Sequence, residues 1–372
     1  ANSLQCLPFP YGFFLLLGSQ QHLIKFELGS NIIRLEDKMI QFFMSVVTLI
    51  NFNLEYHFST EPSRRNRKNM SNTKKNILIT GAGGMIGKAL RKYLSEAGYR
   101  TYPLVRNRLD GPFYYDHKKG SVYLDPKVPL HGIINLAGAN ISDKRWNDNR
   151  KQEIISSREL LTEALSEALA SLKAKPSVLM SGSAIGYYGP TGSDHATEES
   201  PAGSDFLAEV ATRWERATLP AREAGIRTVN MRLGIVLSVT GGVLKNFLLP
   251  MRLAVVGPIG TGHQKLSWIS IHDVLRLVER GLVDEDLHGP VNFVSNHALS
   301  SKDFSIALGK ASGRLRLPSL PAPVARLMFG EMADAALLSS ADVRSSRFKD
   351  ATFELQHPEL ESALKHLLET NT

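Results

Sequence analysis

The stretch from residue 76 to residue 98, NILITGAGGMIGKALRKYLSEAG, constrains the fold more than any other part of the sequence. It reads as a short apolar strand, a glycine-rich loop and an amphipathic helix that ends at a glycine, which is the order of the dinucleotide-binding fingerprint. In that fingerprint the first glycine permits a tight turn, the second lets the backbone approach a pyrophosphate, and the third lets the helix pack closely on the strand. The unsatisfied N–H groups at the start of the helix then face the phosphates. The residues expected at this site are Gly81, Gly84, Met85, Ile86 and Gly87.

The next predicted strand, YRTYPLVRN, carries a basic residue near its end, where an acidic residue would select NAD. NAD enzymes of this fold usually present a carboxylate to the ribose 2′-hydroxyl, whereas an arginine there suits the 2′-phosphate of NADP. Arg106 occupies this position, and no carboxylate follows until Asp110. The sequence therefore favours NADP as the cofactor, the alternative being that Arg106 is a solvated surface residue.

A third apolar run, HGIINLAGAN at 131–140, leads into small residues that let the backbone lie against the adenine ribose. Leu136, Ala137 and Gly138 are the residues expected there. A long helical pattern follows, and Glu153 and Arg158 lie on its first turns. Each of these two charges is either directed toward the cofactor or solvated on the helix surface, and the sequence leaves both alternatives open.

Several further motifs accompany the glycine loop, among them SGSAIGYYG, DFLAEVATRWE, RLGIVLS, GPIGTGHQKLSWISIHDV and the tail PSLPAPVARLMFGEMADAALLSS. With these motifs the chain, from about residue 76 to its end, resembles the extended short-chain dehydrogenase/reductase superfamily. It is most similar to an atypical branch, the epimerase family, whose members are described as sugar-nucleotide epimerase-like or as cell-division inhibitors and which carries a characteristic C-terminal tail domain. The resemblance also implies that Val236, near the end of the strand GIRTVNMRLGIVLS, contacts the nicotinamide ring.

In that superfamily a tyrosine acts as general acid/base, a lysine four residues later supports it, and a serine steadies the reacting carbonyl. The loop SGSAIGYYG offers Ser183 and Tyr187 for the serine and the tyrosine. The required lysine is absent, because Tyr187 is followed four residues later by Thr191, and Tyr188 by Gly192. Ser183 and Tyr187 are therefore candidate catalytic residues, with packing or hydrogen bonding beneath the nicotinamide as the alternative role.

The helix that normally carries the tyrosine and lysine is expected to begin near residue 204, and it holds Phe206 and Val210 instead. Neither side chain can transfer a proton or carry a charge. No lysine occurs between Lys175 and Lys245, so a shift of register cannot restore the pair. A tyrosine acting near neutral pH needs a cation nearby, and Arg213 and Arg232 are the nearest candidates along the chain.

Composition and charge limit the other classes of function. The formal net charge is +8, but residues 1–75 contribute nine Lys/Arg against five Asp/Glu, and the remainder shows no basic face of the kind that binds nucleic acid. Cys6 is the only cysteine and no HExxH pattern occurs, so we expect no metal site. The apolar stretches of the leader are shorter than the roughly 20 residues that span a bilayer, so no membrane association is expected.

The predicted fold is α/β, a Rossmann-type doubly wound fold with a largely parallel sheet and a smaller C-terminal α-rich lobe. Met70 suits a natural start, and the segment before the glycine loop is expected to be a leader, disordered or not native, in a cytoplasmic protein. The expected divisions are a leader at 1–75, an NADP-binding Rossmann domain at 76–240, a substrate-side part at 241–318 and a tail domain at 319–372.

Two functions remain open from the sequence. The first is an NADP(H)-binding, epimerase-like or oxidoreductase-like protein that lacks the usual tyrosine–lysine pair and acts on an unidentified small carbonyl or alcohol. The second is a catalytically silent NADP-binding protein with a regulatory or interaction role.

Overall fold

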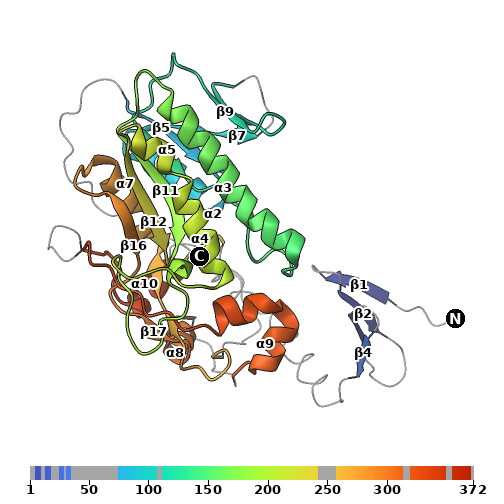
Figure 1. Ribbon diagram of the computed structural model, residues 1–372. Helices are drawn as coiled ribbons and strands as arrows, with labels where there is room; N and C mark the ends of the chain where they lie inside the picture. Colours follow the sequence, from blue (N-terminus) through green and yellow to red (C-terminus); the bar gives the residue numbers. More distant parts are fainter. Residues whose placement is uncertain are drawn as a thin grey trace. The chain divides into compact units, whose positions relative to one another are not determined.

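The computed structural model describes residues 74–106, 111–241, 257–312, 319–348 and 354–369, together with the backbone of four strands near the N-terminus (Figure 1). These strands form two antiparallel pairs, β1 (Gln5–Phe9) with β2 (Phe13–Leu17) and β3 (Lys25–Leu28) with β4 (Asn31–Arg34). The chain falls into two units, Ala1–Arg67 with Leu249–Val255 and Lys68–Leu248 with Val256–Thr372. The leader, like the three divisions proposed for the rest of the chain, stays a prediction.

The larger unit is built on a six-stranded sheet in which every neighbouring pair of strands is parallel. In spatial order the strands are β6 (Arg100–Pro103), β5 (Asn76–Thr80), β10 (Gly132–Asn135), β11 (Val178–Ala184), β12 (Arg227–Leu233) and β16 (Gly289–Phe293). Sequence order runs outward in both directions from β5, as in a doubly wound sheet. The predicted Rossmann-type fold is thereby confirmed.

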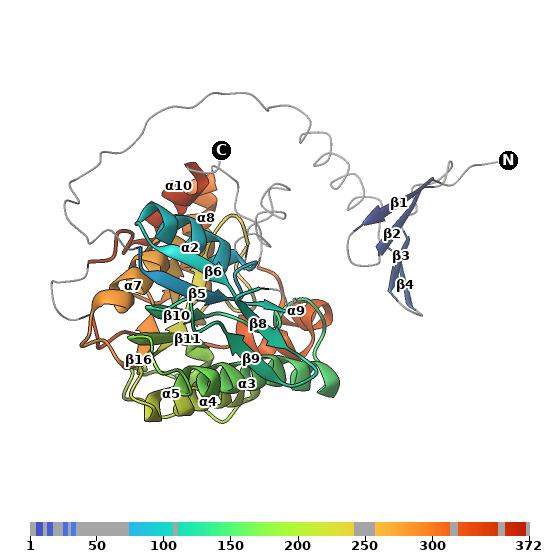
Figure 2. The ribbon, with the colours of Figure 1, turned by 90° about the horizontal axis from the view of Figure 1, so that it is seen from above.

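Helices cover both faces of this sheet, as Figure 2 shows. One face carries α2 (Met85–Glu96) and α7 (Ile271–Val283), and the other carries α3 (Asp148–Ala170), α4 (Phe206–Arg216) and α5 (Leu219–Glu223). Because successive side chains of a strand point to opposite faces, β5 contributes to both layers. Ile77 and Ile79 pack with α2 and α7, while Leu78 packs with Leu165 of α3. Burial on both faces explains why these strands are continuous apolar runs.

A buried polar network joins the carboxyl ends of three central strands. Thr80 donates its hydroxyl to Asn135 Oδ1 at 2.7 Å, and Asn135 Nδ2 donates to Thr162 Oγ1 at 2.8 Å and to Ser181 Oγ at 3.1 Å. All four side chains are essentially buried. Since each buried polar group has a partner, the network fixes the strand ends against one another without an unpaired group.

The chain leaves the main sheet after β6 for a small sheet that the sequence did not indicate. The segment predicted as one strand splits into β6 and β7 (Val105–Arg106), and β7 pairs with β8 (Phe113–Asp116), which pairs with β9 (Ser121–Leu124). Pro103 ends β6, and a proline has no N–H to donate to a neighbouring strand. Arg106 therefore lies at the end of β7 and not on the main sheet.

The remaining short strands pair two by two: β13 (Ile235–Leu237) with β15 (Trp268–Ser270), and β14 (Lys265–Leu266) with β17 (Leu299–Ser300). The C-terminal part is helical as predicted, and its helices are α8 (Ser301–Ser312), α9 (Ala322–Phe329), the single π-helical turn η2 (Ala333–Leu337) and α10 (Leu360–Glu369).

Isolated β-bridges and hydrogen bonds join this C-terminal part to the rest of the unit. Ile259 pairs with Leu320, and Ala196 pairs with Val343, each in a parallel bridge. The buried carboxylate of Glu198 accepts the backbone N–H of Ser346 at 2.7 Å and also binds its hydroxyl at 2.8 Å. The tail thus returns to the carboxyl edge of the sheet. Across the residues that the structure describes, no helix has the length and apolar character that crossing a membrane requires.

Candidate functional site

The glycine loop between β5 and α2 has no room for side chains at two of its glycines. Gly81 adopts φ +62°, and a Cβ built on it would lie 2.6 Å from the carbonyl oxygen of Leu136. A Cβ at Gly87 would lie 2.3 Å from the carbonyl oxygen of Gly81. Gly84 closes the turn by donating its N–H to Gly81 O at 2.9 Å. The loop therefore has the close strand–helix packing that the fingerprint requires.

The first turn of α2 is open to an anion. Its N-cap, Gly84, provides no side-chain acceptor, and the turn contains no acidic residue. The N–H groups of Met85 and Ile86 therefore have neither a capping side chain nor a local carboxylate to satisfy them. Such a helix start is suited to bind phosphate oxygens.

The turn after β10 lies directly beside this loop. The N–H groups of Leu136 and Ala137 both donate to Thr80 Oγ1 at 3.0 Å, and the carbonyl of Leu136 is what a Cβ at Gly81 would strike. Leu136 also packs, with Ile86 and Val236, at the margin of the hydrophobic cluster between the sheet and α2 and α7. The structure thus brings eight of the predicted cofactor residues into one region, namely the five of the glycine loop with Leu136, Ala137 and Val236.

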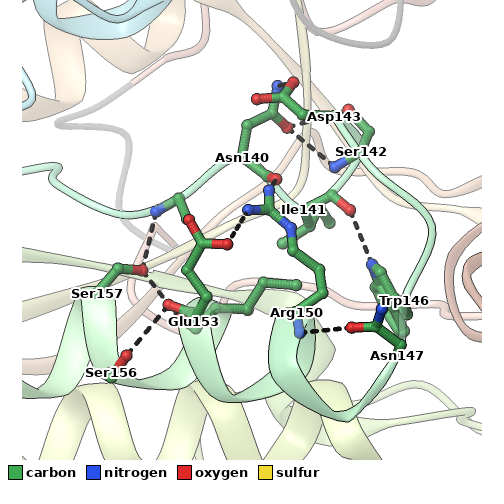
Figure 3. Close-up of polar contacts among 12 residues, drawn as sticks. Asn140, Ile141, Ser142, Asp143, Trp146, Asn147, Arg150, Glu153, Ser156 and Ser157 are labelled. Atoms are coloured by element: carbon green, nitrogen blue, oxygen red, sulfur yellow. Dashed lines mark hydrogen bonds and ion pairs between the residues drawn. The ribbon is translucent and has the colours of Figure 1, made fainter.

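The remaining predicted cofactor residues occupy different environments. The side chain of Arg106 is exposed and forms no hydrogen bond or ion pair with any described residue. Glu153 is exposed and pairs with Arg150 at 2.6 Å, which lowers the pKa of the Glu153 carboxyl. Figure 3 shows this pair, with Arg150 also reaching the carbonyl of Asn140. Arg150 lies on the same helix as Glu153 and forms an ion pair with it. The Glu153 carboxylate is therefore directed along α3 and not toward the glycine loop.

A row of polar residues crosses the carboxyl edge of the sheet on three neighbouring strands. Ser183 of β11 is in register with Arg232 of β12, which is in register with Asn292 of β16. Ser183 donates its hydroxyl to Glu215 Oε1 at 2.6 Å, and Arg232 binds both oxygens of Glu215 through Nε at 2.7 Å and Nη2 at 2.9 Å. Arg232 Nη1 donates to the hydroxyl of Tyr188 at 2.8 Å, and Tyr188 donates to Asn292 Oδ1 at 2.7 Å.

The two tyrosines of the turn η1 (Ile185–Tyr188) differ in what holds them. Tyr188 is buried, and its burial raises the pKa of its hydroxyl to about 12 although Arg232 acts in the opposite direction. Tyr187 is half-buried, and its ring centroid lies 3.5 Å from the guanidinium carbon of Arg232. Its hydroxyl forms no hydrogen bond with any described residue and is not fully enclosed. Of the pair, only Tyr187 keeps a hydroxyl available to another molecule.

Arg232 is the cation that lies beside these tyrosines. Burial opposes its charge, but the hydrogen bonds and charge of Glu215 outweigh this and raise the pKa of the Arg232 guanidinium. The other candidate, Arg213, instead pairs with Glu159 at 2.6 Å and with Glu209 at 3.2 Å. The sequence left the choice between the two arginines open, and the structure brings only Arg232 to the ring of Tyr187.

The start of α4 is apolar and covered. The N-cap Asp205 accepts the N–H of Ala208, so Phe206 is the first helical residue. The ring of Phe206 lies edge-on to that of Trp146 with centroids 5.0 Å apart, and the buried Val210 belongs to the same hydrophobic cluster. No acid or base therefore replaces the tyrosine and lysine at these two positions.

The parallel sheet, the glycine loop and the open helix start together define a Rossmann-type α/β protein. A model of the NAD dependent epimerase/dehydratase family matches residues 77–290, and a domain of unknown function, DUF1731, matches residues 320–367. The chain belongs to the NAD dependent epimerase/dehydratase family.

Relatives of the same length as the larger unit support this assignment. The epimerase family protein Mb2239 of Mycobacterium bovis is 34% identical over 290 residues, which is 77% of this chain and 96% of that protein. The human epimerase family protein SDR39U1 is 32% identical over 297 residues, or 78% of this chain and 99% of the relative.

Solved structures show the same architecture. A crystal structure of human SDR39U1 with NADPH matches with a TM-score of 0.71 and 30% identity, covering 79% of this chain and 99% of the other. The nucleoside-diphosphate sugar epimerase from Corynebacterium glutamicum matches with a TM-score of 0.63 at 22% identity, covering 99% of this chain and 80% of the other. The second likeness bears on the fold alone.

Sequence reasoning missed Glu215 and Asn292, which complete the network around Arg232. Glu215 is the last residue of the motif DFLAEVATRWE. The motif therefore contains this carboxylate, but the motif alone does not indicate that Arg232 binds it. Asn292 lies in an apolar strand, GPVNF, where a single polar residue amid buried neighbours indicates a hydrogen bond inside the protein.

Proposed function

We propose that the chain binds NADP(H) and uses it to reduce a small carbonyl compound or to oxidise the corresponding alcohol. The observation that carries the binding part is the glycine loop, in which Gly81 and Gly87 leave no space for a Cβ and α2 begins without an acceptor for its N–H groups. The NADPH in the crystal structure of human SDR39U1 supports the same assignment.

The preference for NADP over NAD rests on Arg106. Its guanidinium is exposed and has no partner in the described part of the chain, so it is available to a 2′-phosphate. Titration of the protein with NADPH and NADH tests this proposal. We expect NADPH to bind roughly 10-fold or more tightly, as one hydrogen bond between charged groups contributes about 1.5–3 kcal/mol, and Arg106→Asp to remove the difference. Equal affinities for the two cofactors in the parent protein would contradict it.

We assign the role of proton donor in this reaction to Tyr187. Bound NADPH supplies the hydride that reduces a carbonyl carbon, and the carbonyl oxygen then needs one proton. The Tyr187 hydroxyl forms no hydrogen bond with a described residue, so it is available to donate this proton. The guanidinium of Arg232, 3.5 Å from the ring of Tyr187, attracts the negative charge that proton donation leaves on the tyrosine. Water returns the proton afterwards. Ser183 has the supporting role, because its own hydroxyl proton is held by Glu215.

Tyr188 provides the matched control for this assignment. We expect Tyr187→Phe to slow turnover by roughly 10²–10⁴-fold, the usual contribution of a positioned acid or base, with little change in NADPH affinity. Tyr188→Phe removes a hydroxyl from the neighbouring residue, and should mainly lower the free energy of unfolding, by about 1–3 kcal/mol. The assay is NADPH oxidation with a panel of small carbonyl compounds. Equal turnover in parent and Tyr187→Phe would refute the role.

A second function, an NADP-binding protein without turnover, is favoured by the apolar start of α4. Phe206 and Val210 pack with Trp146 and Met332, so the positions of the usual catalytic pair serve the hydrophobic core. If no carbonyl compound in the panel is reduced while NADPH binds, this second function holds. Phe206→Tyr with Val210→Lys then restores no activity, because the new side chains enter a packed cluster.

A further inference from the structure

The carboxylate of Glu215 joins the last turn of α4 to two neighbouring strands of the main sheet. Its Oε1 accepts the hydroxyl of Ser183 on β11 at 2.6 Å and Nε of Arg232 on β12 at 2.7 Å. Its Oε2 accepts Nη2 of Arg232 at 2.9 Å. Both members of the ion pair are nearly buried. Charge-assisted hydrogen bonds away from water are strong, so they fix the carboxylate and the guanidinium relative to the strands.

This bidentate contact determines how the guanidinium of Arg232 is tilted. A guanidinium is planar, and two parallel N–H···O bonds along its Nε–Nη2 edge fix both its position and its plane. The guanidinium carbon lies over the ring of Tyr187, 3.5 Å from the ring centroid. Nη1 makes one further contact, with the hydroxyl of Tyr188 at 2.8 Å, and a single hydrogen bond does not fix the tilt of a plane. Glu215 therefore supplies the orientation that the contact with Tyr187 requires.

Glu215 also keeps the positive charge of Arg232 in place. Burial opposes this charge, and the hydrogen bonds and charge of Glu215 outweigh burial and raise the pKa of the guanidinium. Among the residues that the structure describes, no second carboxylate forms an ion pair with Arg232. Without Glu215 a nearly buried cation would have no counterion, and its long side chain would gain by turning toward water. The charge would then leave the ring of Tyr187.

The pair Arg213–Glu159 has the same bidentate geometry in a different setting. Arg213 binds Glu159 through Nε at 3.0 Å and Nη2 at 2.6 Å, and this pair joins α4 to α3. Among the described residues no aromatic ring lies against the guanidinium of Arg213. The contact between carboxylate and guanidinium is therefore matched in the two pairs, and the tyrosine ring is present in only one of them.

We propose that Glu215 is a positioning residue for Tyr187, which orients Arg232 against the tyrosine ring and keeps its charge there while the tyrosine donates a proton. The negative charge of Glu215 by itself disfavours negative charge on Tyr187. The guanidinium is in direct contact with the ring and no described contact joins Glu215 to Tyr187, so the nearer cation dominates. The proposal deepens the proposed NADP(H)-dependent function and rests on it. It gives α4 a part in the reaction through its last turn, although its start is apolar.

The kinetic test compares Glu215→Gln with Glu159→Gln, the same substitution at the matched pair. With a carbonyl compound that the parent reduces, we expect Glu215→Gln to lower kcat roughly 10–100-fold, as a misplaced proton donor does, with KM and NADPH affinity within about 3-fold of the parent. Glu159→Gln should keep the parent kcat. In the Tyr187→Phe background Glu215→Gln should cause no further fall, because the group that it positions is gone. A parent-like kcat in Glu215→Gln, or an equal fall in both backgrounds, overturns the proposal.

A spectroscopic measurement decides the proposal without a substrate. The full chain is labelled with 3-fluorotyrosine, and the fluorine NMR signal of Tyr187 is assigned by its loss in Tyr187→Phe. We expect Glu215→Gln to move or split this signal as Arg232→Met does, and Glu159→Gln to leave it in place.

Glu215→Asp serves where Glu215→Gln does not fold, because it keeps the buried charge and draws the carboxylate back by one methylene group. It should move the Tyr187 signal in the same direction as Arg232→Met. A signal that stays in place in a folded Glu215 variant overturns the positioning role. Failure of the parent to reduce any compound of the panel refutes the proposed function instead, and the signal still decides whether Glu215 holds Arg232 at Tyr187.

Discussion

The pairs Arg232–Glu215 and Arg213–Glu159 have nearly the same geometry and differ in burial, which allows a direct comparison of their contributions to stability. Arg232 and Glu215 have side-chain exposures of 4% and 12%, whereas Arg213 and Glu159 have 37% and 25%. Arg232→Met leaves a nearly buried carboxylate without its counterion, and breaking a buried pair in this way costs roughly 3–5 kcal/mol. Arg213→Met breaks a pair that water screens, for which about 1 kcal/mol or less is typical.

Denaturant unfolding of the parent and the two variants, with the slope of the free energy against denaturant checked for constancy, measures both costs. We expect Arg232→Met to lose at least about 2 kcal/mol more than Arg213→Met, from the difference between the two ranges. Adding Glu215→Leu to Arg232→Met should recover part of the loss, because the unpaired buried charge is then gone. Equal costs for the two single substitutions, or a double variant less stable than Arg232→Met, would refute the argument from burial.

The remaining predictions concern the glycine loop and two histidines. Gly87→Ala should lower NADPH affinity by roughly 10-fold or more, since its Cβ would lie 2.3 Å from a carbonyl oxygen, while Gly83→Ala, with nothing within 4 Å, should leave it close to the parent value. Burial lowers the pKa of both His272 and His357 below 6.5, with neighbouring histidines adding to the effect. The unfolded state then binds more protons below about pH 6.5, so the free energy of unfolding should be constant above that pH and fall as the pH drops below it. Unfolding curves from pH 7.5 to 5.5 measure this fall, and His272→Gln should flatten it; a slope unchanged in that variant would show that other groups are responsible.

The main sheet could be predicted because its strands carry their own signal. Residues 77–79, 133–134 and 178–180 are apolar runs buried on both faces, and runs of that kind belong to parallel sheets covered by helices. The small sheet formed by β7, β8 and β9 carried no comparable signal. Whether a strand continues past Pro103 or turns to pair elsewhere depends on contacts with β8, which lies several residues further along the chain.

The candidate site could be predicted only in part for a similar reason. The positions of Ser183, Tyr187 and Arg232 follow from local motifs, but their contacts depend on strand register. Register between β11 and β12, whose residues are some fifty positions apart, is set by packing across the sheet and not by either segment alone. The sequence accordingly named two arginines as possible partners for the tyrosines, and only the paired strands distinguish Arg232 from Arg213.

The apolar start of α4 and the C-terminal tail are physically coupled. Phe206 and Val210 would present an apolar surface at the carboxyl edge of the sheet, and exposed apolar surface of that kind favours association with other proteins. The tail covers it, because Met332 belongs to the same cluster and Lys151, whose ammonium lies 5.2 Å from the ring of Phe206, pairs with Glu331 at 2.6 Å. A polar tyrosine and lysine at these positions would have to be buried beneath the tail without partners, at a cost of several kcal/mol. The proton donor that we propose therefore has a physical reason to lie away from these two positions, and the tyrosine hydroxyl of η1 that forms no hydrogen bond with a described residue belongs to Tyr187.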